Sequence, residues 1–109
     1  MERINLFNDI SLNNDEKTLF KMRNENDLLL AVVHLKKGHS IAKHHANAKV
    51  SILVFQGSII SCISGETIKM NYGDVITLEK GTEMEFLNSE CELTSLLLVK
   101  SPNPGVSLK

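Results

Sequence analysis

The stretch from Gly38 to Gly57, GHSIAKHHANAKVSILVFQG, decides the fold of this chain. It begins and ends on turn glycines, and its part from Val50 to Phe55 is β-branched and aromatic, which is typical of a buried strand. The stretch from Gly73 to Asn88, GDVITLEKGTEMEFLN, has the same character. Both stretches predict short strands joined by tight turns.

The rest of the chain repeats this pattern of short apolar runs between turn signals. Strands are also predicted at Lys17 to Arg23, Leu28 to Leu35, Ser58 to Ile63, Glu66 to Met70, and Cys91 to Val99. Eight or nine such strands indicate an all-β sandwich or small barrel. We expect one domain, with an N-terminal segment and first strand at 1–27, a barrel core at 28–100 and a tail at 101–109. Residues 8–16 fit either a loop or one helical turn.

Composition excludes several classes of function. The 109 residues carry a formal charge of −1, with twelve basic and thirteen acidic side chains spread along the chain. There are four phenylalanines, one tyrosine and no tryptophan, so neither a basic stripe nor base stacking favours a nucleic-acid partner. The N-terminus lacks the apolar region of a signal peptide, and the longest apolar run, Leu28 to Val33, is far too short to cross a membrane. We therefore expect a soluble cytoplasmic protein with no membrane partner.

The two cysteines, Cys62 and Cys91, do not form a CxxC pair and are too few for a disulfide scaffold. Each lies in an apolar, strand-like context, which favours a buried thiol that acts as a small apolar side chain. Catalytic thiol chemistry would need a histidine or a cation nearby in space.

The two glycine-bounded stretches resemble the two motifs of the cupins, which are jelly-roll β-barrels. The first cupin motif reads G-x5-H-x-H-x3,4-E-x6-G and the second reads G-x5-P-x-G-x2-H-x3-N. Five structural positions and one histidine fall in register without gaps: Gly38, His44, Gly57, Gly73, Gly81 and Asn88. The resemblance covers about residues 28–100 and implies a single-domain cupin jelly-roll barrel (a double-stranded β-helix).

The resemblance also implies where a cupin would hold its metal. In the family, two histidines and a glutamate of the first motif and a histidine of the second form the ligand set, which suits iron, manganese, nickel or zinc. This chain carries His44, Ala46, Val50 and Met84 at these positions. One imidazole and one thioether do not hold a hard divalent cation tightly, so we expect no metal cofactor. A rearranged site of His44 with His39, His45 or His34 stays as the alternative.

Alternation along the strands predicts which side chains face the barrel interior. If position 50 faces inward, so do Ile52 and Val54, because successive side chains of a strand point to opposite faces. The predicted ligand-binding set is His44, Ala46, Val50, Ile52, Val54, Met84 and Phe86. It describes an apolar pocket with His44 as its polar anchor. The same side chains could instead pack the core and leave no pocket.

The opposite face of the Val50 strand carries Ser51, Leu53 and Phe55, which would leave an apolar surface outside the barrel. An uncovered apolar face on a small domain favours a partner, and we expect a homodimer. The function that these observations favour is a metal-free barrel that binds a small molecule. The alternatives are a metal-dependent cupin enzyme, similar to a dioxygenase or isomerase, and a structural or regulatory dimer with a filled barrel. No catalytic residue is assigned.

Overall fold

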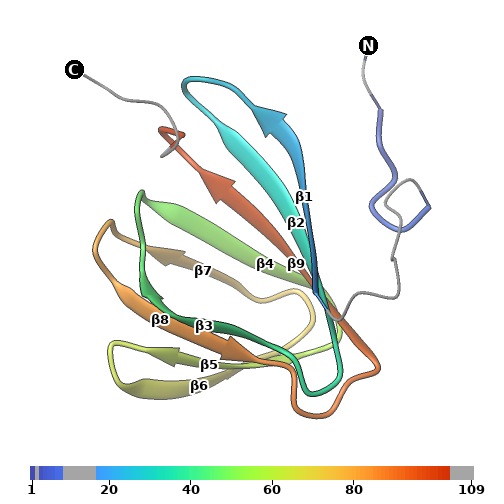
Figure 1. Ribbon diagram of the computed structural model, residues 1–109, viewed down its shortest axis with the longest axis vertical. Helices are drawn as coiled ribbons and strands as arrows, with labels where there is room; N and C mark the ends of the chain where they lie inside the picture. The colour runs from blue at the N-terminus through green and yellow to red at the C-terminus, as the bar shows by residue number, and fades with distance from the viewer. Residues whose placement is uncertain (2, 9–16, 104–109) are drawn as a thin grey trace.

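The computed structural model describes residues 1, 3–8 and 17–103. These residues form nine β-strands and no helix (Figure 1). The strands are β1 (Lys17–Asn24), β2 (Leu29–Lys36), β3 (Ser40–His45), β4 (Val50–Gln56), β5 (Ile59–Ile63), β6 (Glu66–Met70), β7 (Val75–Leu78), β8 (Glu83–Leu87) and β9 (Leu93–Lys100). The prediction of an all-β fold is confirmed.

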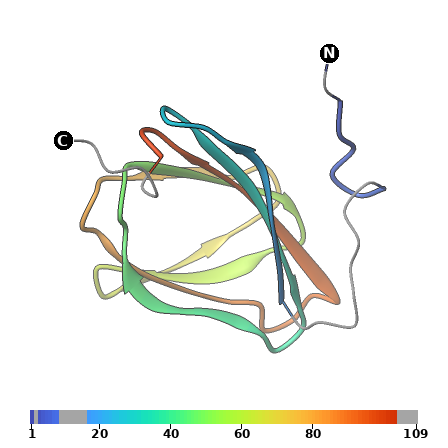
Figure 2. The same cartoon turned by 45° about the horizontal axis from the view of Figure 1, so that its top comes forward.

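The strands form two antiparallel sheets that face each other (Figures 1 and 2). One sheet has the order β1-β2-β9-β4-β7 and the other the order β3-β8-β5-β6. Each sheet therefore takes strands from both halves of the chain. β3 was not among the predicted strand ranges. Its sequence, SIAKHH, is mostly exposed and lacks the apolar alternation that marks the other strands.

The hydrophobic core lies between the two sheets. Alternate residues of β4 face it, as the period of two predicts, and they pack against alternate residues of β2, β8 and β9. The buried cluster consists of Val33, Leu35, Ala46, Val50, Ile52, Val54, Ile59, Met70, Leu78, Met84, Phe86 and Leu96. All of these side chains lie between residues 33 and 96.

Gly57 shows why a motif position is a glycine. It turns the chain from β4 into β5 with a φ of +74°, a backbone conformation that residues with a side chain rarely adopt. A Cβ at this position would also lie 2.8 Å from the Leu93 carbonyl oxygen and 2.8 Å from Thr94 Oγ1. The β4–β5 turn can therefore pass this closely over the start of β9 only because residue 57 has no side chain.

The N-terminal residues 3–8 lie against the outer face of the five-stranded sheet. The Phe7 ring meets the Phe55 ring edge-on at 5.4 Å between centroids, and Phe55 in turn meets His34 at 6.1 Å. Of the segment 8–16, for which a loop or a helical turn was expected, all but Asn8 lies outside the described residues. The described residues contain no helix of the length and apolarity that a membrane crossing requires.

Candidate functional site

The predicted inward-facing residues of both motifs come together at the centre of the barrel. Val50, Ile52, Val54, Met84 and Phe86 are each at most 3% exposed. An empty pocket would leave exposed area on the side chains that line it, and here almost none remains. These five side chains therefore pack against one another and leave little area exposed to solvent.

His44 does not join these side chains. It is exposed, and its Nδ1 lies 2.8 Å from the backbone carbonyl oxygen of Ala42. Strand pairing places His44 opposite Met84, but the register shifts between Ile41 and His44. The extra residue in this shift places His44 on the same face as Ile41 and Met84. The polar anchor that the sequence predicted for the barrel interior therefore lies on the inward face of β3 but stays exposed, and it is not buried among the side chains of the barrel centre.

Ala46 links the two motif stretches through its backbone. Its N–H donates to the Thr82 carbonyl oxygen at 2.8 Å, and its own carbonyl accepts from the N–H of Gly81 at 2.7 Å. The β3–β4 turn and the β7–β8 turn are thereby joined at one end of the barrel (Figure 1). The Ala46 side chain is buried among the core residues.

The histidines of the chain are not brought together around His44. His34 is buried on the outer face of β2, His39 lies in the turn after β2, and His45 is exposed with its Nε2 3.9 Å from a Glu83 carboxylate oxygen. The described residues contain no group of three or more His, Cys, Asp or Glu side chains that could hold a metal ion. The motif positions 46, 50 and 84 carry two aliphatic groups and a thioether. The donor set present does not fit a cupin metal centre.

His34 owes its burial to the N-terminal segment. It is 2% exposed, and its Nδ1 lies 2.6 Å from Ser95 Oγ on the neighbouring strand. Its Nε2 is buried without a hydrogen-bond partner that meets the usual geometry. Burial lowers the pKa of the His34 imidazole below its ordinary value, and the nearby backbone of Leu6 opposes this effect only in part. His34 is thus a structural histidine of the sheet's outer face.

A polar group that the sequence analysis missed is Lys100. It opposes the buried residues Leu29 and Val50, so its side chain leaves β9 on the inner face of the sheet. Its Nζ donates to Asn47 Oδ1 in the β3–β4 turn at 3.1 Å. Burial lowers the pKa of this amine, and the positive charge of Lys21 lowers it further. Alternation from Leu96 already places residue 100 inward, and this was the signal available in the sequence.

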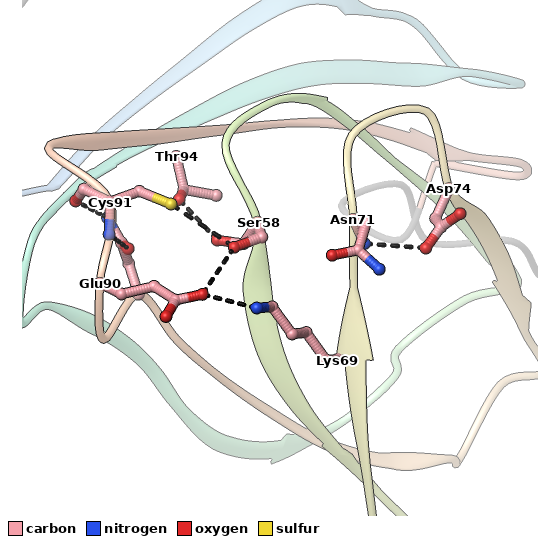
Figure 3. Close-up of polar contacts among 8 residues, drawn as sticks. Ser58, Lys69, Asn71, Asp74, Glu90, Cys91 and Thr94 are labelled. Carbon is pink, nitrogen blue, oxygen red and sulfur yellow. Dashed lines mark hydrogen bonds and ion pairs between the residues drawn. The ribbon is translucent and has the colours of Figure 1, made fainter.

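The opposite end of the barrel carries a second polar cluster, drawn in Figure 3. Cys91 Sγ lies 3.4 Å from Ser58 Oγ, and Lys69 pairs with Glu90 at 2.7 Å. Hydrogen bonding from Ser58 lowers the pKa of the Cys91 thiol. The Lys69 cation is engaged by the Glu90 carboxylate, so it is not directed at the thiol. Cys91 and Cys62 are both half-buried and free.

Asn88 organises the loop that leads into this cluster. It is fully buried, and its Nδ2 donates to the carbonyl oxygens of Leu35 at 2.8 Å and Cys91 at 2.9 Å. Its Oδ1 accepts from the Cys91 N–H at 3.1 Å. The last position of the second motif therefore holds the β8–β9 connection against β2.

Comparison with known proteins supports the fold. No protein-family model matches the chain, and no curated protein matches it. Among solved structures, an RmlC-like cupin from Methanocaldococcus jannaschii is similar with a TM-score of 0.79 and 18% identity, covering 87% of this chain and 88% of that chain. A cupin superfamily protein from Desulfitobacterium hafniense has a TM-score of 0.80 and 13% identity, covering 93% and 92%. A protein from Thermotoga maritima, described as a predicted oxalate decarboxylase, has a TM-score of 0.73 and 18% identity, covering 79% and 80%.

These identities are low, so the likeness concerns the path of the backbone and not the chemistry of the site. The nine strands, their order in two sheets and the in-register motif positions agree with it. This chain has the double-stranded β-helix fold of the RmlC-like cupins.

Proposed function

We propose that this chain is a small-molecule-binding protein without a metal centre of its own, that it works as a homodimer, and that its ligand binds at the end of the barrel where β9 ends. The observation that carries the proposal is the change along the inner face of β9. Leu96 is fully buried, Leu98 is only half-buried, and Lys100 follows at the end. At this end of β9 the side chains are no longer fully buried, so an apolar side chain is partly exposed next to one amine.

Two further side chains extend this apolar surface. Ile63 ends β5 at the same end of the barrel and is half-buried against the core. Leu19 shares the inner face of the five-stranded sheet, because it opposes the core residue Val33, yet it is 56% exposed. Binding sites for small molecules combine apolar walls with a few placed polar groups, and this end of the barrel offers both.

The homodimer is supported by the outer face of the five-stranded sheet. Strand pairing aligns one apolar residue from each strand in a single row, in the order Phe20, Val32, Leu97, Leu53 and Val75. Residues 3–8 lie against part of this face, and Val32 within the row is fully buried. The two ends of the row stay open, with Phe20 38% and Val75 61% exposed, and exposed apolar side chains of this kind favour burial against a second copy.

Ligand binding is tested on metal-stripped protein by thermal shift against a panel of neutral, anionic and cationic metabolite-sized compounds. At ten times its Kd a ligand stabilises the fold by about 1.4 kcal/mol, which raises the Tm by about 5 °C or more. We expect Leu98→Ala to reduce the ligand-induced shift and Leu87→Ala, on the outer side of β8, to leave it unchanged. A shift that requires added iron, manganese, nickel or zinc would favour the metal-dependent enzyme, and a panel without any shift would favour the filled barrel.

The dimer is tested by light scattering at tens of micromolar protein. We expect a dimer for the native chain and a monomer for Val75→Asp, because the new charge would enter the apolar row. Tyr72→Ser, in the exposed turn before β7, is the matched control and should stay dimeric. A native chain that is monomeric at this concentration would contradict the dimer.

A further inference from the structure

Two lysines lie on the inner face of the five-stranded sheet at the end where β9 ends. Lys21 of β1 opposes Ala31, and Lys100 of β9 opposes Leu29. Residues opposite each other in an antiparallel pair share a face, so both side chains leave the sheet on its core side. Their strands are separated by β2 alone, which places the two backbones on the order of 10 Å apart. Side chains of this length can direct both amines toward one point.

The charges of this lysine pair are not compensated. Neither Lys21 nor Lys100 forms an ion pair with a carboxylate among the described residues. Lys100 is half-buried, and both its burial and the charge of Lys21 lower the pKa of its amine. Two like charges near each other, one of them partly removed from water, are an unfavourable arrangement without a counter-ion. An anion between them would relieve both effects.

Asn47 adds a donor beside the lysine pair. Its Oδ1 already accepts the hydrogen bond from Lys100, so its Nδ2 remains to donate to an anion. Apolar surface adjoins the same point, because Leu19 and Leu98 lie two residues before Lys21 and Lys100 on the same strands and the same face. A ligand that satisfies all of these groups has one anionic end and an aliphatic body.

We propose that Lys21, Lys100 and the Asn47 amide bind the carboxylate of a small aliphatic acid whose chain lies on Leu19 and Leu98. This inference rests on the proposed function and names the class of its ligand. The carboxylate oxygens accept hydrogen bonds from the two amines and from Asn47 Nδ2. Binding in this way needs no covalent step and no metal ion.

The test uses the full chain with three probes: hexanoate, the uncharged hexanol and inorganic phosphate. Affinity is measured by calorimetric titration, after circular dichroism has shown that each variant is folded. We expect hexanoate to bind at least tenfold more tightly than hexanol or phosphate. Lys100→Met and Lys21→Met should each weaken hexanoate binding at least tenfold. Lys37→Met removes the same charge in the turn after β2, at the opposite end of the barrel, and should change the affinity less than twofold.

A second readout is the titration of the Lys100 amine followed by NMR. Bound hexanoate should raise the pKa of this amine, and hexanol should not. Equal binding of hexanoate and phosphate, or hexanoate binding that Lys37→Met weakens as much as Lys100→Met, would overturn the aliphatic-acid site. If hexanoate fails while other compounds of the panel still bind in a manner that depends on Leu98, this inference falls and the proposed function stands. If no binding depends on Leu98, both fall.

Discussion

Replacing Asn88 by alanine tests what the second motif stretch does in this protein. The Asn88 side chain makes three hydrogen bonds, and all three partners are backbone groups of Leu35 and Cys91. It is fully buried, so water does not take its place readily in the variant. The substitution therefore removes the contacts that hold the β8–β9 connection against β2 and adds no new ones.

The expected magnitude follows from the number of hydrogen bonds. Each contributes about 0.5–1.5 kcal/mol net, so three contribute about 3 kcal/mol. For a domain of this size, a loss of about 3 kcal/mol lowers the Tm by on the order of 12 °C. Asn88→Asp should be at least as destabilising at neutral pH, because a buried carboxylate would face the carbonyl oxygens of Leu35 and Cys91.

Urea unfolding followed by circular dichroism measures this difference, with an unchanged m-value as the sign that the unfolded state is the same. Asn71→Ala is the matched control, because Asn71 lies in the exposed β6–β7 turn and bonds there through its backbone, its N–H to Asp74 Oδ2 at 2.8 Å and its carbonyl oxygen to the Asp74 N–H at 2.9 Å. We expect the control to change the free energy of unfolding by less than about 0.5 kcal/mol. A loss below about 1 kcal/mol for Asn88→Ala would refute the role assigned to this residue.

Two further predictions concern the β4–β5 turn and the outer face of the sheet. Gly57→Ala should destabilise the fold by about 1–3 kcal/mol more than Gly73→Ala, because both glycines have positive φ but only a Cβ at position 57 meets the Leu93 backbone; equal urea midpoints for the two variants would contradict this. For His34, the lowered pKa means that the unfolded chain binds the proton first as the pH falls. The contribution of His34 to the free energy of unfolding should thus be constant above the ordinary histidine pKa of about 6.5. The free energy of unfolding should decrease as the pH falls from there toward the lowered pKa. This decrease with pH should be smaller in His34→Gln.

Much of the fold was predictable because it depends on local rules. Glycines at 57 and 73 mark turns that need a positive φ, and the period of two along β4 fixed which of its side chains face inward. Positions 84 and 86 followed by the same rule on β8. β3 was not predicted, because its exposed, polar sequence carries no such alternation.

The candidate site was less predictable because it depends on contacts between distant segments. His44 pairs with the buried Met84 across a register shift yet stays exposed to solvent, and no sequence signal marks that shift. His34 is buried by a segment almost thirty residues earlier in the chain. The role proposed for Lys100 depends on its neighbours Lys21 and Asn47. These two residues come from other parts of the chain and lie at the same end of the barrel.

The packed centre and the charged end of the barrel have one physical explanation. A barrel that holds a metal must keep polar ligands and space at its centre, and buried charge is costly unless it is fully compensated. With Ala46, Val50 and Met84 at the ligand positions, the centre is closed by apolar contact and needs no ion to balance it. Polar groups then lie at the two ends of the barrel, where water can reach them, and Lys100 lies at the end of β9. An uncompensated amine such as that of Lys100 is tolerated there, and it is available to a ligand for the same reason.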